Sequence, residues 1–300
     1  MTIKNRSKIC LIISGAIIAI ALILTLTGNG INLGIDFEGG LSMQYDMKTA
    51  VTSSDVSDVL AAMGVTSSTV TVQGSGDNEV NIRIKDVSKD DIQKVQADFE
   101  AGIKEKYPEA VSIGDVNYVG PVAGATLVKN AVISVLLAAA LMLIYIAIRF
   151  DLNSGIAAVF GLLHDVLIML SFMVIFRSVI QMNSSFIAAA LTIVGYSINN
   201  TIVIFDRIRE NAKKMPTSPK EEVTNISIRE SLGRTICTTV TTLITIVALC
   251  ILGVASIREF ALPIIVGILS GVYSANMING YVWAFLEEKR AGRKVKAKKA

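Results

Sequence analysis

The chain has 300 residues, of which 52% are hydrophobic and 18% are charged, and its mean hydropathy is +0.58. A single water-soluble core of this length could not bury so much apolar surface, so the composition excludes an ordinary soluble protein and indicates a membrane protein. The formal charge of +3 is unevenly spread, because Thr27–Thr126 holds fifteen acidic and seven basic residues. The remainder of the chain is therefore strongly basic.

Six apolar runs are long enough to cross about 30 Å of hydrocarbon, which takes roughly 20 residues. They lie near Ile9–Leu26, Leu127–Ile148, Ile156–Phe176, Phe186–Phe205, Ile236–Val254 and Phe260–Leu286. The first run has a basic start, as a signal peptide does, but it is too long and no small-residue cleavage pattern follows it. We interpret it as a retained membrane anchor.

Basic residues gather before the first run, after the second and fourth, and after the last. With six spans, all these places fall on one side of the membrane, and the positive-inside rule makes that side cytoplasmic. We therefore expect a multi-pass protein of the cell inner membrane with both termini in the cytoplasm. The basic tail could bind anionic lipid or RNA; we favour a solvated topology signal and expect no nucleic-acid partner.

Between the first two spans, two-residue and helical periodicities alternate. In chain order they predict a strand at Leu41–Met47, a helix from Ser53 or Ser54 to Gly64, strands at 67–73 and Glu79–Lys85, a helix capped by Ser88 with Asp91 at the capping-box position, and a last strand at 110–120. The order β-α-β-β-α-β is that of a ferredoxin-like α+β domain. Such domains serve many functions, so the fold alone names none.

These patterns predict an α-helical polytopic membrane protein with a ferredoxin-like extracytoplasmic domain between its first two transmembrane helices. The expected parts are a cytoplasmic N-terminus with the first helix (1–27), the extracytoplasmic domain (28–126), a five-helix transmembrane bundle (127–286) with a cytoplasmic loop at 206–234, and a basic cytoplasmic tail (287–300). Pro216 and Pro219 mark a turn in the loop. Its second half is predicted to be an amphipathic helix at the membrane surface.

Polar side chains within the predicted spans are the candidate functional residues. The third span holds His164, the only histidine, next to Asp165 at mid-depth. An ionisable group at the bilayer centre costs at least ~2.5 kcal/mol, so it normally faces the interior of the bundle and has a partner there. The two residues either bond neighbouring helices or take part in function, and the sequence leaves both readings open.

The fourth and fifth spans each carry a polar face at helical spacing. In the fourth, Tyr196, Asn199 and Asn200 share a face; in the fifth, Arg234 begins a stripe of threonines. Threonine hydroxyls can bond their own helix or join helices, which is the simpler explanation of the stripe. Small residues of the sixth span, Ser270 and Ser274 among them, are explained by close helix packing.

Several short motifs, in order along the chain, resemble those of one known family. They are GIDFEGG (Gly34–Gly40), VGPVAG (Val119–Gly124), RFD (Arg149–Asp151), HD (His164–Asp165), GYSINNTIVIFDRIREN (195–211), SLGRTICTTVTTL (231–243) and GVYSANMI (271–278). The chain therefore resembles the SecD/SecF family, membrane proteins of the resistance-nodulation-division superfamily that work beside the bacterial protein-export channel. The resemblance covers essentially the full chain.

The resemblance implies an auxiliary subunit of the Sec export machinery, with no enzymatic activity, cofactor or metal. Such a subunit would pair with SecD beside the SecYEG channel, with YajC left open as a further partner, and use the proton-motive force to assist unfolded preproteins across the cytoplasmic membrane. An alternative is a half-transporter of the same superfamily that exports small molecules or lipids. A membrane-embedded hydrolase is disfavoured, because His164 alone offers no catalytic dyad or metal motif.

One position departs from the family pattern. The family run usually has an aspartate, thought to carry the proton, where this chain has Asn200, and asparagine cannot titrate. Arg234, which matches the arginine of the family's SLxRT motif, then lacks its acidic partner. Either Asp165 or Asp206 substitutes, SecD carries the titration, or coupling is lost. We expect the polar faces of the third, fourth and fifth spans, Asn199 included, to meet in one hydrated cluster.

The signature GIDFEGG includes Gly34, Asp36, Gly39 and Gly40. Gly39 and Gly40 permit positive φ and a tight join between span and domain, while Asp36 and Glu38 could bind a cation or a basic segment of substrate. We favour a hinge, because movement of the outer domain would need a pivot there.

Overall fold

The structure is a computed structural model that describes residues 3–65, 68–73, 78–85, 87–113, 116–178, 180–253 and 255–299. The chain divides into two compact units. We call the first the membrane unit, which consists of Met1–Asn32, Ile133–Ile180 and Ser185–Ala300. The second, the sheet unit, consists of Leu33–Val132 and Gln181–Ser184.

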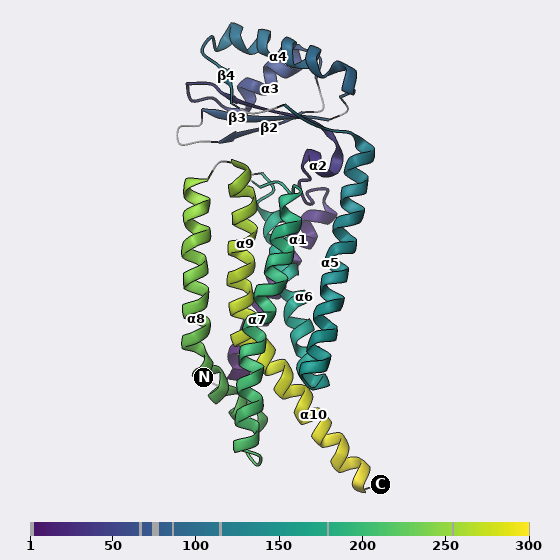
Figure 1. Cartoon of the computed structure of the whole chain (residues 1–300), viewed down its shortest axis with the longest axis vertical. Helices are drawn as coiled ribbons and strands as arrows, with labels where there is room; N and C mark the ends of the chain where they lie inside the picture. Colours follow the sequence, from purple (N-terminus) through teal and green to yellow (C-terminus); the bar gives the residue numbers. More distant parts are fainter. Residues whose placement is uncertain are drawn as a thin grey trace. The chain divides into compact units, whose positions relative to one another are not determined.

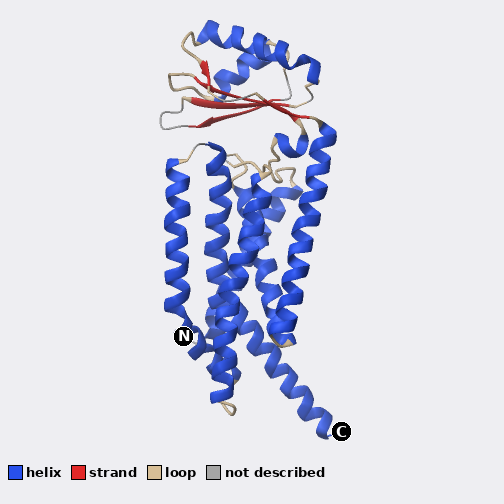
Figure 2. Cartoon of the chain, in the orientation of Figure 1, coloured by secondary structure: helices blue, strands red, loops and turns tan. Residues whose placement is uncertain are grey.

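Long helices make up the membrane unit (Figures 1 and 2). They are α1 (Ile3–Leu26), α5 (Pro121–Arg149), α6 (Leu152–Ile175), α7 (Ser185–Lys214), α8 (Lys220–Leu252), α9 (Ala255–Ser274) and α10 (Gly280–Lys299), and the first part of α5 belongs to the sheet unit. By length and composition, the described residues contain six helical stretches that could cross a membrane. The chain is thus a multi-pass membrane protein, as the hydropathy predicts.

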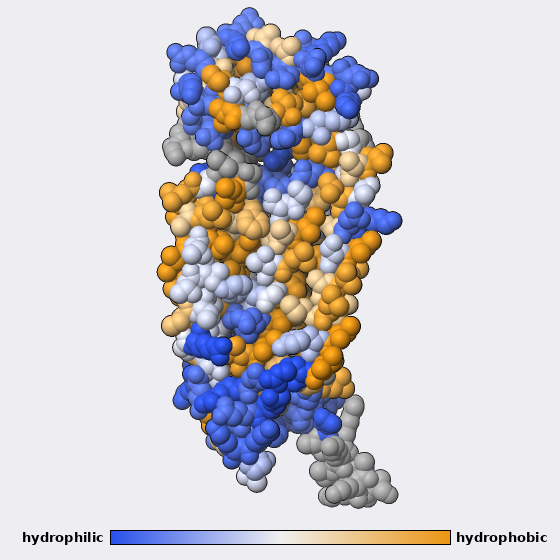
Figure 3. All heavy atoms as spheres, in the orientation of Figure 1, coloured by the Kyte–Doolittle hydropathy of each residue, from blue (hydrophilic) through white to orange (hydrophobic). Residues whose placement is uncertain are grey.

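Helices α6, α7 and α9 form the centre of the membrane unit, whereas α1, α5 and α8 present most of their apolar side chains outward. Hydrophobic side chains cover the visible flank of this unit and hydrophilic ones gather at its lower end, where α7 turns into α8 (Figure 3). In water such a flank would be unfavourable, but in a bilayer it faces lipid.

The last span is interrupted by a π-helical turn at Ala275–Asn279, which joins α9 to α10. The wider turn leaves backbone groups for other helices, and the Met277 carbonyl accepts a hydrogen bond from the Ser7 hydroxyl of α1. α9 also contains Pro263. The π-turn therefore ties the sixth span to the first.

The segment 206–234 was expected to be a cytoplasmic loop around Pro216 and Pro219 whose second half is an amphipathic helix leading into the fifth span. α7 extends to Lys214 and α8 begins at Lys220, so the predicted turn and second helix are present, but the first half is the end of α7 and not loop. Charged residues there are good helix formers and pair across the two helices, as Arg207 does with Glu230.

One antiparallel sheet organises the sheet unit. Its strands are β1 (Gly40–Asp46), β2 (Ser68–Gln73), β3 (Glu79–Ile84), β4 (Val111–Ser112) and β5 (Asn117–Val119), in the order β2-β3-β1-β4 with β5 also pairing β1. Helices α3 (Ser53–Ala62) and α4 (Ile92–Lys106) lie on one face (Figure 1). This is the strand order that a β-α-β-β-α-β chain of ferredoxin-like type produces.

The apolar residues of β1 alternate, so they all point to the face of the sheet that the helices cover. Leu41, Met43 and Tyr45 pack there against Phe99 of α4 and Leu60 of α3, and all five side chains are buried.

The helix starts differ from expectation. α3 is capped by Thr52, which forms a capping box with Asp55, not by Ser53 or Ser54. The predicted capping box at Ser88 and Asp91 is also wrong: a 3₁₀ turn at Lys89–Asp91 precedes α4, with no side-chain cap.

The single last strand predicted at 110–120 is instead two short strands that pair with opposite ends of β1. β4 lies against Tyr45 and Asp46, and β5 lies against Gly40 to Ser42. Between β4 and β5 the chain has two residues more than one continuous strand paired with β1 would need. An insertion of this kind interrupts the ladder as a bulge does.

Candidate functional site

Asp165 is the most deeply buried charged side chain of the described bundle, with no exposed surface. It lies in the middle of α6, which begins at Asp151, whose carboxylate accepts hydrogen bonds from the backbone N–H groups of Asn153 and Ser154. This cap and the apolar sequence that follows fix α6 as a straight span between α1, α7 and α9. Asp165 therefore faces other helices and not lipid.

Three serine hydroxyls donate to the Asp165 carboxylate. Ser197 of α7 lies 2.5 Å from Oδ2, Ser274 of α9 lies 2.8 Å from the same oxygen, and Ser270 of α9 lies 2.7 Å from Oδ1. Hydrogen bonds to an ionised acceptor are roughly twice as strong as neutral ones. The carboxylate thus joins α6, α7 and α9 at one point.

His164 adds a fourth helix to this group. Its Nδ1 lies 2.9 Å from Asp165 Oδ1, and its Nε2 lies 2.7 Å from the Ser14 hydroxyl of α1. The imidazole stacks on the Tyr273 ring with 5.9 Å between centroids. Tyr273 donates to the Cys10 carbonyl oxygen of α1 at 2.6 Å, and its oxygen lies 3.4 Å from Ser14 Oγ. We call these residues, together with the three serines, the Asp165 cluster.

Glycines bring the helices close enough for these bonds. A Cβ added at Gly271 would lie 3.2 Å from the backbone of Ser197, and one at Gly267 would lie 2.2 Å from the Ile193 side chain. α9 therefore contacts α7 almost backbone to backbone. The serines at 270 and 274 reach Asp165 because of that approach.

Asn200 is buried in α7, one helical turn from Ser197, whereas Asn199 is exposed. The register of α7 against α8 follows from the bonds Tyr196–Thr242 and Asn211–Ser227. It places Asn200 at the level of Thr238, and within the described residues the buried Asn200 Nδ2 has no hydrogen-bond partner.

The structure does not bring the other predicted residues into the Asp165 cluster. Arg234 lies exposed on α8. Asp206, near the end of α7, bonds Arg149 at 3.0 Å and lies 3.5 Å from Arg209. Asp165 is bonded from the fourth span by Ser197, which lies outside the face predicted there, whereas Tyr196 of that face bonds Thr242 of the fifth span and Arg234 is exposed. Among the described residues, no three His, Cys, Asp or Glu side chains are placed to hold a metal ion.

The GIDFEGG residues form a tightly held segment of the sheet unit. Gly39 and Gly40 both have positive φ, 81° and 129°. Asp36 Oδ2 accepts from the Ser184 backbone N–H at 2.8 Å, and the Gly34 N–H donates to the Met182 carbonyl oxygen at 2.8 Å. The segment that follows the first span is thereby joined to the connection between α6 and α7.

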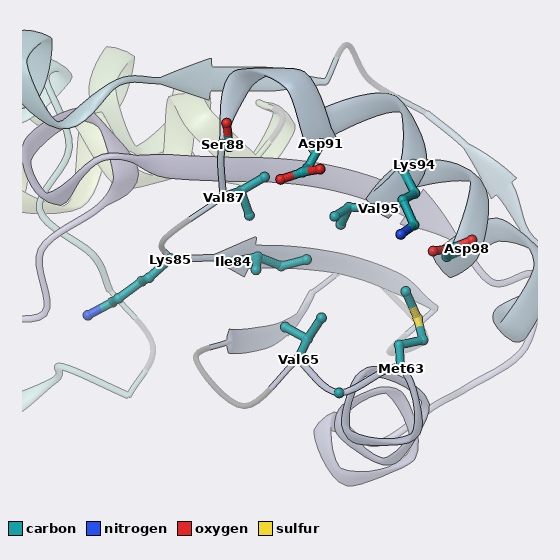
Figure 4. A pocket seen from close by; sticks show the side chains of 11 residues that line it. Met63, Val65, Ile84, Lys85, Val87, Ser88, Asp91, Lys94, Val95 and Asp98 are labelled. Carbon is teal, nitrogen blue, oxygen red and sulfur yellow. The ribbon is translucent and has the colours of Figure 1, made fainter.

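A hollow of about 460 Å³ in the sheet unit is a second candidate (Figure 4). Val65, Ile84 and Val95 form its apolar floor, and Asp91 and Asp98 of the α4 region lie at its rim. The floor is the edge of the domain core. The apolar lining is thus explained by its place in the domain core, and we assign no ligand to the hollow.

Sequence reasoning missed the serines around Asp165. Ser270 and Ser274 were assigned to packing, and Ser14 and Ser197 received no role. The available signal was their position: serines four residues apart on a glycine-rich face, in a bundle that holds a mid-span carboxylate, point toward that carboxylate.

Comparison with known families agrees with this architecture. A family model described as "Protein export membrane protein SecD/SecF, C-terminal" matches residues 99–289, and one described as "SecD/SecF GG Motif" matches residues 25–51. The chain belongs to the SecD/SecF family. The second match contains the GIDFEGG segment, and the first contains Asp165 and its serine partners on α7 and α9.

Among curated SecD/SecF relatives, "Protein translocase subunit SecF" of Rhodothermus marinus is 35% identical over 297 residues, covering 97% of this chain and 94% of its own. The SecF of Rickettsia bellii is 34% identical, over 86% of this chain and 84% of its own. "Protein translocase subunit SecDF" of Bacillus subtilis is 35% identical over 93% of this chain but only 37% of its own length. The chain thus corresponds to one part of a fused SecDF protein.

Two solved SecDF structures resemble the chain closely. The crystal structure of SecDF from Thermus thermophilus, titled a translocon-associated membrane protein, superimposes with a TM-score of 0.81 at 31% identity. It matches 95% of this chain and 38% of that one. SecDF in a "Super-membrane-facing form" gives a TM-score of 0.67 at 30% identity, over 99% of this chain and 39% of that one. The names of these relatives support an auxiliary subunit of the Sec translocase.

Proposed function

We propose that this chain pairs with SecD and couples the proton-motive force to preprotein export, with the Asp165 cluster as its proton-binding site. The observation that carries the proposal is the fully buried Asp165 carboxylate, bonded by three serines from two neighbouring helices and by a histidine of its own helix. An ionisable residue within a span is a functional site by default, because its burial is costly.

The cluster has two hydrogen-bonding states. With Asp165 ionised, all three serines donate to it. With Asp165 protonated, one oxygen becomes a donor and a serine must turn its hydroxyl away, which hydroxyls can do because they both donate and accept. Ser274 has an alternative acceptor, since its Oγ also lies 3.2 Å from the Gly271 carbonyl oxygen. Proton binding can therefore alter the contact between α6 and α9.

The energies are of a suitable size. Removing a charge from the bilayer centre relieves at least ~2.5 kcal/mol, and one charge falling through 100 mV supplies about 2.3 kcal/mol. A helix bundle with two packings a few kcal/mol apart would be shifted by that amount. Asn200 cannot contribute a charge, whereas Asp165 can, and it is the most deeply buried carboxylate among the described residues.

Pairing with SecD is supported by the outward polar stripe of α8. Arg234, Thr238, Thr241 and Thr245 are exposed along one side of this span. The three threonine hydroxyls bond carbonyl oxygens of their own helix, so the charge of Arg234 is the group that would be costly against lipid and that a second bundle would cover. The fused SecDF relatives provide one within a single chain.

In the proposed arrangement the chain lies in the cell inner membrane, with its termini and the α7–α8 turn in the cytoplasm and the sheet unit outside. The basic residues of the α7–α8 turn and of the tail support this orientation. SecYEG, YajC and unfolded preproteins are the proposed further partners. Gly34, Asp36, Gly39 and Gly40 are proposed as the join at which the sheet unit moves.

Export into inverted membrane vesicles tests the coupling. Vesicles containing this chain, SecD and SecYEG are compared with and without a proton-motive force. We expect Asp165→Asn, which keeps a hydrogen-bonding side chain but removes titration, to lower export to the rate measured without the force.

The matched control is Asp206→Asn. It removes a carboxylate from α7 whose partners are Arg149 and Arg209 at the end of the bundle, and we expect it to keep the response. A full response in Asp165→Asn vesicles would contradict the assignment of proton binding to Asp165. Failure of the chain to co-purify with SecD in mild detergent would contradict the pairing.

A further inference from the structure

Helix α1 contacts the rest of the membrane unit along a line of small residues. Its buried side chains among those described are Ser7, Ser14 and Ala21, spaced seven residues apart, while Ile12, Ile20 and other large side chains are exposed. Lipid is as apolar as these side chains, so burial gives no driving force for α1 to stay in place. Polar bonds from the two serines therefore contribute much of its attachment.

Those two bonds end in different places. Ser7 donates to the Met277 carbonyl oxygen of the π-turn. Ser14 meets His164 Nε2 at 2.7 Å, and through this ring it is linked to Asp165. Only the Ser14 bond can therefore respond directly to the charge of the carboxylate.

A count of protons shows how it responds. With one proton on the His164–Asp165 pair, the ionised carboxylate holds that proton on Nδ1, so Nε2 is bare and accepts from the Ser14 hydroxyl. A second proton that enters the hydrogen bond between Nδ1 and Oδ1 leaves one hydrogen between the ring and the carboxylate and puts the other on Nε2, whether the pair is written as two neutral groups or as imidazolium and carboxylate. A second proton on Oδ2, with Ser274 turned to the Gly271 carbonyl oxygen, would instead leave Nε2 bare.

The Ser14 bond therefore reverses when the second proton enters the hydrogen bond between His164 and Asp165 Oδ1. Nε2–H becomes the donor, and the Ser14 hydroxyl hydrogen is freed to turn toward Tyr273 Oη, 3.4 Å away, while Tyr273 keeps its own bond to the Cys10 carbonyl oxygen. We infer that His164 transmits the protonation state of Asp165 to α1 through Ser14, with Tyr273 as the residue that positions the ring. This inference rests on the proposed role of Asp165.

The groups that face the pair are few. α7 presents Ser197, with Asn200 one turn away, and neither titrates; α9 presents Ser270, Ser274 and the Tyr273 phenol; α1 presents Ser14 and, beside Tyr273, Cys10. Among the contacts that the structure describes, no lysine, arginine or second carboxylate touches the pair. Asp165 and His164 thus carry the response to pH.

α1 is connected along the chain to the sheet unit. It leads through residues 27–32 directly into the GIDFEGG segment of the sheet unit. A change at Ser14 thereby reaches the start of the sheet unit along one helix.

Because His164 is the only histidine, ¹⁵N-histidine labelling of the full chain, purified without a histidine tag in lipid nanodiscs, gives the NMR signals of this ring alone. We expect protonated Nδ1 and bare Nε2 at high pH, and an added hydrogen on Nε2 as the pH falls. Asp165→Asn should abolish the preference for Nδ1–H. A ring whose Nε2 stays bare at low pH, that carries hydrogen on Nε2 throughout, or that keeps its tautomer in Asp165→Asn, would overturn the inference.

A second measurement follows α1 itself. With Cys10, Cys237 and Cys250 replaced by alanine, spin labels on Ile23→Cys of α1 and Ile251→Cys of α8, both exposed, report the distance between these helices. We expect Asp165→Asn to shift the mean distance by roughly 1–2 Å, the size of known helix shifts. Ser14→Ala should remove that shift.

Ser7→Ala is the matched control, because it removes the other serine bond of α1 without touching His164, and it should keep the shift. The inference would be overturned if Asp165→Asn shifted the distance even in the Ser14→Ala background, or if it caused no shift when Ser14 is present. Neither measurement requires export. If Asp165→Asn left proton-driven export in vesicles unchanged, the proposed function would be contradicted. If export did depend on Asp165, but neither the His164 tautomer nor the position of α1 changed with its protonation, only the transmission through His164 would be contradicted.

Discussion

At the level of single residues, the backbone of Gly40 shows why the GIDFEGG signature ends in two glycines. Its φ is 129°, a region that other residues rarely adopt, and a Cβ there would lie 2.5 Å from the Ile84 carbonyl oxygen of β3. Both conformation and contact exclude a side chain. The first residue of β1 can lie so close to β3 only as glycine.

Gly40→Ala is therefore expected to destabilise the β1–β3 pair by about 1–3 kcal/mol, the cost of a strained backbone together with displacement of β3. Gly64 separates the two causes, since its φ is 79° but its Cβ would meet open space. Gly64→Ala should cost roughly 1 kcal/mol. Native-state hydrogen exchange of the β1 and β3 amides in the full chain measures both; equal losses in the two variants would show that the contact with Ile84 is unimportant.

At the level of elements, the start of α3 depends on a charge. Hydrogen bonding from Thr52, with further bonding from Lys106, lowers the pKa of Asp55 to about 2. The unfolded value is about 3.9. Because the folded pKa is the lower one, ionised Asp55 stabilises α3 above about pH 4, and this contribution is lost as the pH falls toward 2.

We therefore expect the first-turn amides of α3 to lose protection from hydrogen exchange between about pH 4 and pH 2, ahead of those of α4, whose start has no side-chain cap. Thr52→Ala should speed exchange in α3 at pH 5 and remove most of the pH dependence, because it removes the largest cause of the lowered pKa. Parallel loss of protection in α3 and α4 across this range would show that Asp55 does not control the helix start.

The elements also show how far the sequence could predict the fold. Six spans were predictable because each apolar run alone exceeds the membrane thickness. Thr52 could have been chosen as the cap over Ser53 and Ser54, because an acidic residue stands three positions after it. The split of the last strand was not predictable, since the pairing of its two parts with β1 depends on partners 65 or more residues away.

The candidate site was predictable only in part, for a physical reason. Helical periodicity tells which residues share a face, but not which helix lies opposite that face. Asp165 and His164 could be singled out by the cost of their burial, whereas the assignment of Ser270 and Ser274 required the contact of α9 with α6 and α7. Arg234 shared a predicted polar face and yet lies outside the cluster.

At the level of the whole molecule, the described membrane unit combines the buried Asp165 cluster with an exposed polar stripe on α8. The cluster joins α6 to α1, α7 and α9, whereas the stripe that begins at Arg234 faces outward. The chain corresponds to 37–39% of the fused SecDF proteins, whose remaining length can supply a second bundle. In the proposed pairing, such a bundle lies against this stripe.

A photo-crosslinking amino acid placed on either side of α8 tests this arrangement. Benzoylphenylalanine at Thr241, on the polar stripe, is expected to form a covalent adduct with SecD in membranes that contain both chains, because the guanidinium of Arg234 on this side favours a protein partner over lipid. The same residue at Ile244, 63% exposed on the neighbouring apolar side, should react mainly with lipid. Adducts with SecD from Ile244 but none from Thr241 would place the second bundle against the apolar side and leave the stripe without a partner.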